Sequence, residues 1–308
     1  MKLYNREKGR PKVMMEVHNV YAGYWGKPVL HDINLSFHEG INIVLGPNGA
    51  GKTTLFRVCS GVLKPYKGEV LVDGRDVYRD AEARKLIGYL PHRDGLIEGL
   101  TVKENLLFYA KIYGINNIDE RIEELNKIVN IENLFNTRVA ELSHGQRRRV
   151  ALLRTLLHNP KVLLLDEPSE GLDPLTAKNL REFIKDLSHK GNFTVVYSTH
   201  NLYEALELAE RIVVIKNGGV VLQGTLDELK RFLGKIKVGL RVRGDPRPIL
   251  NSMGYNVVQD GKMWVTEVNS EDEIGRIVDE LTKNKITVLE IKEIGNPLEE
   301  ILERMEGD

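Results

Sequence analysis

Residues 46–53 read Gly46-Pro47-Asn48-Gly49-Ala50-Gly51-Lys52-Thr53, directly after a short apolar run at residues 41–45. A helical pattern begins near Lys52, and in the order strand, glycine-rich loop, helix the backbone N–H groups can surround a polyphosphate. Lys52 adds a positive charge beside the outer phosphates, and Thr53 offers its hydroxyl to a bridging Mg²⁺. The stretch predicts a bound nucleoside polyphosphate, although many classes of nucleotide-using protein share it. The residues expected to contact the nucleotide here are Gly46, Pro47, Asn48, Gly49, Ala50, Gly51, Lys52, Thr53 and Thr54.

Residues 162–165 form another apolar run of strand length, which ends in Asp166 and Glu167. Parallel sheets bind ligands at the carboxyl ends of their strands, so both carboxylates are expected near the loop. We expect Asp166 to hold the Mg²⁺ shell. Glu167 is expected to orient and deprotonate a water for attack on the γ-phosphate. The alternative is a pair of solvated acids that merely ends a strand.

The chain as a whole alternates strand-length apolar runs with helical patterns, and this indicates an α/β core. The runs at residues 41–45, 162–165, 194–198 and 211–215 are continuously apolar, which is typical of parallel strands covered on both faces. Residues 15–21, 33–37 and 69–72 predict antiparallel strands beside this core. Residues 95–158 have helical periodicity and predict a helical subdomain.

The pattern of apolar and polar residues changes near Gly234, and a smaller second domain is expected at residues 235–308. Strict alternation at residues 236–243 predicts a half-buried strand, and the order β-α-β-β-α-β that follows favours a split βαβ sandwich. Asn296, Pro297 and Glu299 predict the start of a last helix. We therefore expect a basic tail at residues 1–12, a main domain at 13–233 and an accessory domain at 235–308.

Composition narrows the classes of partner. Forty-four basic residues balance forty-four acidic ones among 308, so the whole molecule has no charge that would attract nucleic acid or an acidic membrane surface. The single cysteine, Cys59, fits a reducing compartment and reads as a small core residue. No apolar run approaches the roughly 18 residues of a membrane-spanning helix. If the function concerns a membrane, another subunit is expected to cross it.

The segment Leu142-Ser143-His144-Gly145-Gln146 starts twenty residues before the carboxylate strand, at the start of a predicted helix. With the phosphate loop and the carboxylates in this order, the chain resembles the ABC ATPase family over roughly residues 13–233. The resemblance implies a P-loop NTPase core with an antiparallel β subdomain and a helical subdomain, followed by a small α+β domain. It also implies that Ser143, Gly145 and Gln146 contact the ATP bound by a second cassette, so that two ATP lie between two chains.

Further residues match the pattern of that family. Asp173 resembles the loop residue that crosses the dimer interface, and His200 resembles the histidine that hydrogen-bonds the γ-phosphate. Tyr24 resembles the aromatic residue that stacks on adenine, although Trp25 beside it competes for that role.

Two residues depart from the pattern. His144 replaces a signature glycine, and we expect nucleotide binding to survive because Ser143 and Gly145 are the groups that approach the nucleotide. His92 stands where the family usually has a glutamine that touches Mg²⁺ and the attacking water. An imidazole cannot reproduce both amide functions in one orientation, so hydrolysis or coupling is expected to be tuned rather than lost.

The resemblance implies the ATP-binding, ATP-hydrolysing subunit of an ABC transporter, which uses ATP and Mg²⁺ and drives a separate transmembrane permease. It would pair with a second copy or a homologous subunit, at the cytoplasmic face of the cell membrane. The tail at residues 297–305 looks like that of cassettes serving drug and antibiotic exporters.

The alternative is a soluble mechanical ATPase acting on nucleic acid or ribosomes, but the long heptads or doubled cassettes of such proteins are absent from this sequence. A small-molecule kinase would share the phosphate loop, but its chemistry does not require the signature at Ser143. We expect no nucleic-acid partner, because arginines such as those at 147–149 usually form a solvated helix face or ion pairs in these cassettes.

Overall fold

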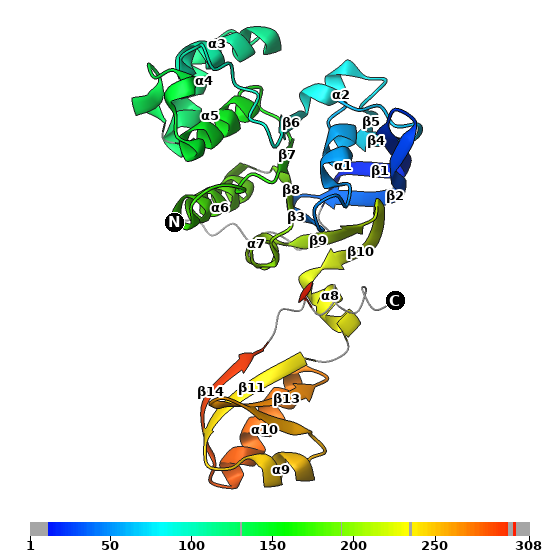
Figure 1. Cartoon of the computed structure of the whole chain (residues 1–308), viewed down its shortest axis with the longest axis vertical. Coiled ribbons are helices and arrows are strands. Elements are labelled where there is room, and N and C mark those ends of the chain that lie inside the picture. Colours follow the sequence, from blue (N-terminus) through cyan, green and yellow to red (C-terminus); the bar gives the residue numbers. More distant parts are fainter. Residues whose placement is uncertain (1–11, 130, 192, 234–235, 295–297, 300–308) are drawn as a thin grey trace. The chain divides into compact units, whose positions relative to one another are not determined.

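The computed structural model describes residues 12–129, 131–191, 193–233, 236–294 and 298–299 (Figure 1). The chain divides into two compact units, Met1–Gln223 and Gly224–Asp308, and each has a hydrophobic core of its own. The division falls ten residues before residue 233, where we expected the main domain to end. The predicted basic tail, apart from Lys12, and most of the predicted last helix lie outside the described residues.

A six-stranded sheet forms the centre of the first unit. Its strand order is β10-β9-β3-β8-β7-β6. The strands are β3 (Gly40–Leu45), β6 (Ile87–Leu90), β7 (Val162–Asp166), β8 (Thr194–Thr199), β9 (Arg211–Lys216) and β10 (Gly219–Thr225). The pairs β6–β7, β7–β8, β8–β3 and β3–β9 are all parallel, and every residue of β7 and β8 is buried. The continuously apolar runs thus form parallel strands, as predicted.

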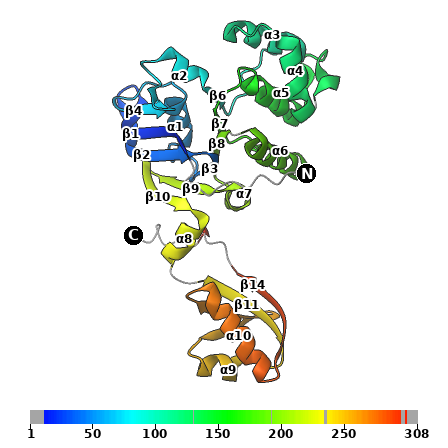
Figure 2. The ribbon, with the colours of Figure 1, turned by 180° about the vertical axis from the view of Figure 1, so that it is seen from behind.

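Helices cover both faces of this sheet (Figures 1 and 2). Helix α1 (Lys52–Cys59) packs on one face, and α6 (Pro174–Gly191) and α7 (Leu202–Leu208) lie on the other. Because neighbouring strands are parallel, the ends of β3, β7 and β8 open at one edge. The loop at residue 46, the carboxylates at 166–167 and His200 all follow those ends.

An antiparallel sheet lies on the other side of α1. Its order is β2-β1-β4-β5, from β1 (Val13–Tyr24), β2 (Lys27–His38), β4 (Lys67–Val72) and β5 (Arg75–Asp76). The short helix α2 (Ala81–Lys85) follows β5. Buried Phe37 and Phe56 join this sheet and α1 in a single core, which also contains Cys59 as a small buried residue. The predicted antiparallel strands and the structural reading of Cys59 are confirmed.

The helical subdomain comprises α3 (Val102–Tyr113), α4 (Ile118–Val129) and α5 (His144–Leu156), with 3₁₀ turns at Glu132–Leu134 and Val139–Glu141. Thr101 and Glu104 cap the start of α3, and Ser143 and Gln146 cap the start of α5, each as a reciprocal pair of side-chain bonds. After α5, the His158 ring stacks on Tyr113 at 4.2 Å between centroids. The predicted helical insertion between residues 95 and 158 is therefore present.

The second unit begins with α8 (Leu226–Leu233) and continues through β11 (Ile236–Arg243), α9 (Arg247–Ser252), β12 (Val257–Asp260), β13 (Met263–Val268), α10 (Glu271–Lys283) and β14 (Thr287–Glu293). Its sheet has the order β12-β13-β11-β14 and is antiparallel throughout. Strand β13 lies between β11 and β12, which α9 connects, so the split βαβ sandwich is confirmed. Leu240, Leu250, Ile277 and Leu281 are buried in its core.

Among the described residues, no helix is both long enough and apolar enough to cross a bilayer.

Candidate nucleotide-binding site

The loop between β3 and α1 has the backbone geometry that a phosphate-binding loop requires. Gly51 is in the left-handed region at φ 106°, and Gly49 is there at φ 82°. At Gly46 a β-carbon would lie 2.3 Å from the carbonyl oxygen of Ile215, so only glycine fits. Helix α1 begins at Lys52, as predicted, so the loop N–H groups and the helix N-terminus face the same space.

A pocket of about 370 Å³ opens over this loop. Its lining residues come from β2, the loop, the start of α1 and the segments that follow β6 and β7: Val29, Asn48, Gly49, Gly51, Lys52, Thr53, Thr54, His92, Glu167 and Glu170. The structure thus brings together most of the predicted loop residues with His92 and Glu167. Gly46, Pro47 and Ala50 shape the loop without lining this pocket.

Lys52 is almost completely buried, with 4% of its surface exposed. Its Nζ donates to the carbonyl oxygens of Gly46 at 2.7 Å and Pro47 at 3.1 Å. It also forms an ion pair with Oε1 of Glu167 at 3.0 Å. The ammonium therefore lies between the loop and the carboxylate, where a γ-phosphate would compete for it.

Glu167 is held on both carboxylate oxygens. Lys52 binds Oε1, and Nδ1 of His200 lies 3.2 Å from Oε2. Burial raises the pKa of the Glu167 carboxyl, but contacts with Glu170 and Lys52 outweigh burial, so its pKa is lowered. An ionised carboxylate beside the loop can accept a proton from water, which is the chemistry predicted for Glu167.

Asp166 ends β7 and is fully buried. Its Oδ1 accepts a hydrogen bond from the Ser198 hydroxyl at 2.7 Å, whereas Oδ2 is buried with no partner among the described residues. Burial raises the pKa of Asp166, and hydrogen bonds from Ser198 and Thr53 act against that rise. A buried carboxylate oxygen without a partner, beside the Thr53 hydroxyl, is a donor set that suits Mg²⁺. Sequence reasoning missed Ser198, although a hydroxyl within an otherwise apolar strand was a visible signal.

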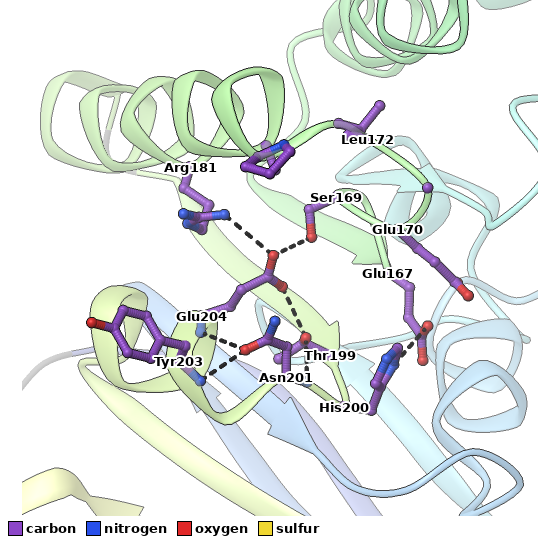
Figure 3. A pocket seen from close by; sticks show the side chains of 13 residues that line it. Glu167, Ser169, Glu170, Leu172, Arg181, Thr199, His200, Asn201, Tyr203 and Glu204 are labelled. Atoms are coloured by element: carbon purple, nitrogen blue, oxygen red, sulfur yellow. Dashed lines mark hydrogen bonds and ion pairs between the residues drawn. The ribbon is translucent and has the colours of Figure 1, made fainter. Parts of the chain in front are cut away.

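A second pocket, of about 460 Å³, lies beside Glu167 between the segments that follow β7 and β8 (Figure 3). At its far end Glu204 of α7 is 7% exposed and accepts hydrogen bonds from Ser169, Tyr197 and Thr199. Arg181 of α6 donates to the same carboxylate at 3.3 Å. Glu204 therefore connects the segment after Glu167 to the segment after His200. Sequence reasoning gave no signal for this residue.

The signature residues and Asp173 do not line the loop pocket of their own chain. Ser143 and Gln146 cap α5, and Gly145 lies against Thr176 of α6. Asp173 caps α6 through the N–H groups of Leu175 and Thr176, both at 3.1 Å. That these residues contact a nucleotide stays a prediction.

Tyr24 lies at the end of β1, where Arg57 of α1 donates to its hydroxyl at 2.9 Å. Trp25 follows in the left-handed region and is 96% exposed, with its ring 6.0 Å from that of Tyr24. Neither ring lines the loop pocket. Both rings are available at the surface, and adenine stacking by Tyr24 stays a prediction.

The two residues that depart from the family pattern converge on Glu170. Nε2 of His92 lies 2.8 Å from the Glu170 carboxylate, and Nε2 of His144 lies 3.2 Å from the Glu170 carbonyl oxygen. The described residues hold no cluster of three or more histidine, cysteine or acidic side chains suited to a metal ion. A metal role for His92 is untested, and in the structure its partner is Glu170.

The arginine run at residues 147–149 is only partly what the sequence suggested. Arg147 forms ion pairs with Asp94 and Glu98, as expected. Arg148 is instead 4% exposed and donates to main-chain carbonyls around Glu167, so the interpretation as a solvated face was wrong for it. Its partners are distant in sequence, which explains why the local pattern did not reveal them.

Comparison with known proteins agrees with this geometry. Residues 30–170 match the family model described as ABC transporter. The chain is 38% identical over 205 residues to the ABC transporter ATP-binding protein NatA of Bacillus subtilis. That match covers 65% of this chain and 83% of NatA. It is 38% identical over 216 residues to a probable sulfate/thiosulfate import ATP-binding protein, CysA, of Chlorella vulgaris, covering 69% of this chain and 92% of that protein. An uncharacterized ABC transporter ATP-binding protein of B. subtilis, YhcH, is 30% identical over 302 residues and covers 96% of this chain and 97% of its own length.

Among solved structures, a dimeric ATP-binding cassette in a post-hydrolysis state bound to ADP and Pi superposes with a TM-score of 0.63. It is 30% identical, and the match covers 69% of this chain and 99% of that one. The chain belongs to the ABC transporter ATP-binding family. It is an ATPase whose fold is that of the P-loop ABC cassettes.

Proposed function

We propose that the chain is the ATP-hydrolysing subunit of an ABC transporter that works as a pair of cassettes closing on two ATP. The observation that carries this is the division of the predicted site. Lys52, Thr53 and Glu167 line the loop pocket, and His200 contacts Glu167. Ser143 and Asp173 instead cap α5 and α6, and Gly145 packs against α6. A second cassette, either a copy of this chain or a homologue, would supply that missing half.

In the proposed mechanism, the γ-phosphate takes the place of Glu167 as the partner of Lys52. Glu167, released from that ion pair and still beside His200, orients a water and accepts its proton as the water attacks. Thr53 and Asp166 would hold Mg²⁺, which supplies positive charge that neutralises the phosphate oxygens. Ser143 and Gly145 of the second cassette would bind the same phosphate through the start of α5.

Closure and opening of the pair would move a separate transmembrane permease, at the cytoplasmic face of the membrane. We further propose export as the direction. The support is the predicted tail, which resembles that of exporter cassettes. Relatives named for import match 69–75% of this chain, and the relative that matches 96% of it is uncharacterized, so the proposed direction rests on the tail. Transport assays in inside-out and right-side-out vesicles with the permease would separate the two directions.

Two substitutions test the site. Lys52→Ala should abolish detectable ATP binding, because it removes the cation that the γ-phosphate requires. Glu167→Gln should keep ATP affinity within about threefold and lower kcat by at least about a hundredfold, because an amide cannot accept the proton. Equilibrium binding and steady-state phosphate release measure both. Hydrolysis at the normal rate by Glu167→Gln would exclude Glu167 as the base.

A further inference from the structure

Arg148 lies inside the first unit, two residues beyond the Ser143–Gln146 cap of α5, and its guanidinium is fully used. Nε donates to Pro168, Nη1 to Pro91 and His92, and Nη2 to Asp166 and Glu167, in each case to the main-chain carbonyl oxygen and within 2.9–3.0 Å. A guanidinium has five N–H groups, so these five acceptors account for all of them. A lysine has three donors on one atom and cannot span the two loops in this way.

The bonds connect three segments that carry the proposed chemistry. One guanidinium joins α5 to the segment after β6, which holds His92, and to the segment after β7, which holds Glu167. His144, one turn earlier in α5, adds a bond to the carbonyl of Glu170, whose carboxylate binds His92. Helix α5 is therefore bonded to the segments after β6 and β7 of its own chain at two successive turns, through His144 and Arg148.

Glu167 needs such support. It has φ 46°, a left-handed conformation that is strained for a residue with a β-carbon. Strained residues persist only where the surroundings determine their conformation. Arg148 binds the carbonyl before this residue and its own carbonyl, so the two peptide groups flanking its α-carbon are both fixed.

We propose that Arg148 is a positioning residue that sets the orientation of Glu167 in its own chain. The proposal rests on the proposed two-cassette function. Under it, α5 presents its first turn to the ATP of the second cassette and uses the next turn to hold its own carboxylate.

The first test is Arg148→Lys, with Arg148→Gln as a second variant should the lysine prevent folding. We expect kcat to fall by about tenfold or more while ATP affinity changes by less than about threefold, because the loop that binds the phosphates is intact. The matched control is Arg121→Lys. Arg121 also donates to main-chain carbonyls of the segment ending α5, those of Leu156 and Leu157, but lies far from Glu167 in the chain. The Arg121→Lys variant should lower thermal stability about as much as Arg148→Lys does and leave kcat within twofold of the wild-type value. An unchanged kcat in both Arg148 variants, or equal losses of kcat in the control, would overturn the proposal.

Mixed dimers decide whether Arg148 acts within its own chain. Each variant is mixed with Glu167→Gln chains. In a mixed dimer, only one of the two sites keeps an intact Glu167, and that Glu167 comes from the variant chain. The residues at 143–146 of that same site come from the Glu167→Gln chain. A Ser143→Ala mixture should regain activity, because the Glu167→Gln chain supplies an intact Ser143. The Arg148→Lys mixture should regain none. Recovery by Arg148→Lys equal to that of Ser143→Ala would contradict the proposal. Failure of the Ser143→Ala mixture to recover would instead count against the two-cassette arrangement, and the kcat–affinity comparison would then decide the role of Arg148.

Discussion

At the scale of single residues, Glu167 is the point at which the site's interactions meet. Its left-handed backbone costs on the order of 1–3 kcal/mol, and its carboxylate is shared by Lys52 and His200. Strain of this kind is stored where function requires a particular side-chain direction. In the absence of nucleotide, the ammonium of Lys52 and the carboxylate of Glu167 also neutralise each other.

His92 offers a test at the same scale. Its Nε2 is bonded to Glu170, so the imidazole has one nitrogen left for a water or cation, whereas a glutamine amide can donate and accept together. We expect His92→Gln to change kcat by about two- to tenfold, because the amide supplies the second hydrogen-bonding function that the imidazole lacks. Steady-state hydrolysis measures the effect. An unchanged rate would show that His92 does not tune hydrolysis.

Residues whose function depends on local sequence could be predicted, and those whose partners are remote could not. The loop at residues 46–53 carries its own glycines, lysine and threonine, so its geometry follows from a short stretch. Arg148 bonds to Pro91 and Pro168, which are 57 and 20 residues away, and nothing adjacent to it indicates burial. Ser198 and Glu204 also have remote partners: Ser198 binds Asp166, 32 residues away, and Glu204 binds Ser169, 35 residues away. The hydroxyl of Ser198 within an apolar strand was a visible signal, but it did not reveal that partner.

At the scale of elements, the helical subdomain depends on the segment that ends α5. There the His158 ring stacks on Tyr113 of α3, and its Nε2 lies 3.0 Å from the carbonyl of Ile87. Its Nδ1 is buried without a partner among the described residues. This residue links α3, the end of α5 and β6.

The pH dependence of stability should reveal that link. Burial lowers the pKa of His158 below its usual 6.5, so the unfolded chain binds a proton more readily than the folded one. Its contribution is therefore complete above pH 6.5 and is lost as pH falls from there toward the lower folded pKa. We expect His158→Gln to be less stable by about 1 kcal/mol at neutral pH, through lost stacking, and to lose less further stability on acidification.

Urea unfolding of both proteins at about pH 7.5 and pH 5.5 measures this difference. Burial also lowers the pKa of His38, so His158→Gln should keep part of the loss of stability at acidic pH. His38→Gln is the matched comparison, because it removes a histidine with a lowered pKa that lies outside the helical subdomain. Parallel curves for wild type and His158→Gln would show that His158 is not responsible.

At the scale of the whole molecule, the order of elements was readable because periodicity differs between buried strands, helices and half-buried strands. The alternation at residues 236–243 distinguished the second unit from the continuously apolar strands of the first. The division into units falls after Gln223, inside β10, ten residues before the predicted end of the main domain, and the predicted domain bounds stay a prediction. A helical pattern reports an apolar face but not the surface on which that face packs.

The central claim is that ATP joins two chains, and the variant Glu167→Gln tests it most directly. Because that variant should bind ATP without turning it over, closed pairs should accumulate. Analytical ultracentrifugation with Mg²⁺ should show one chain without nucleotide and a mass of two chains with ATP. A Ser143→Arg substitution in the same background should return the protein to one chain by blocking the start of α5. Glu167→Gln that binds ATP and still sediments as a single chain would contradict the account.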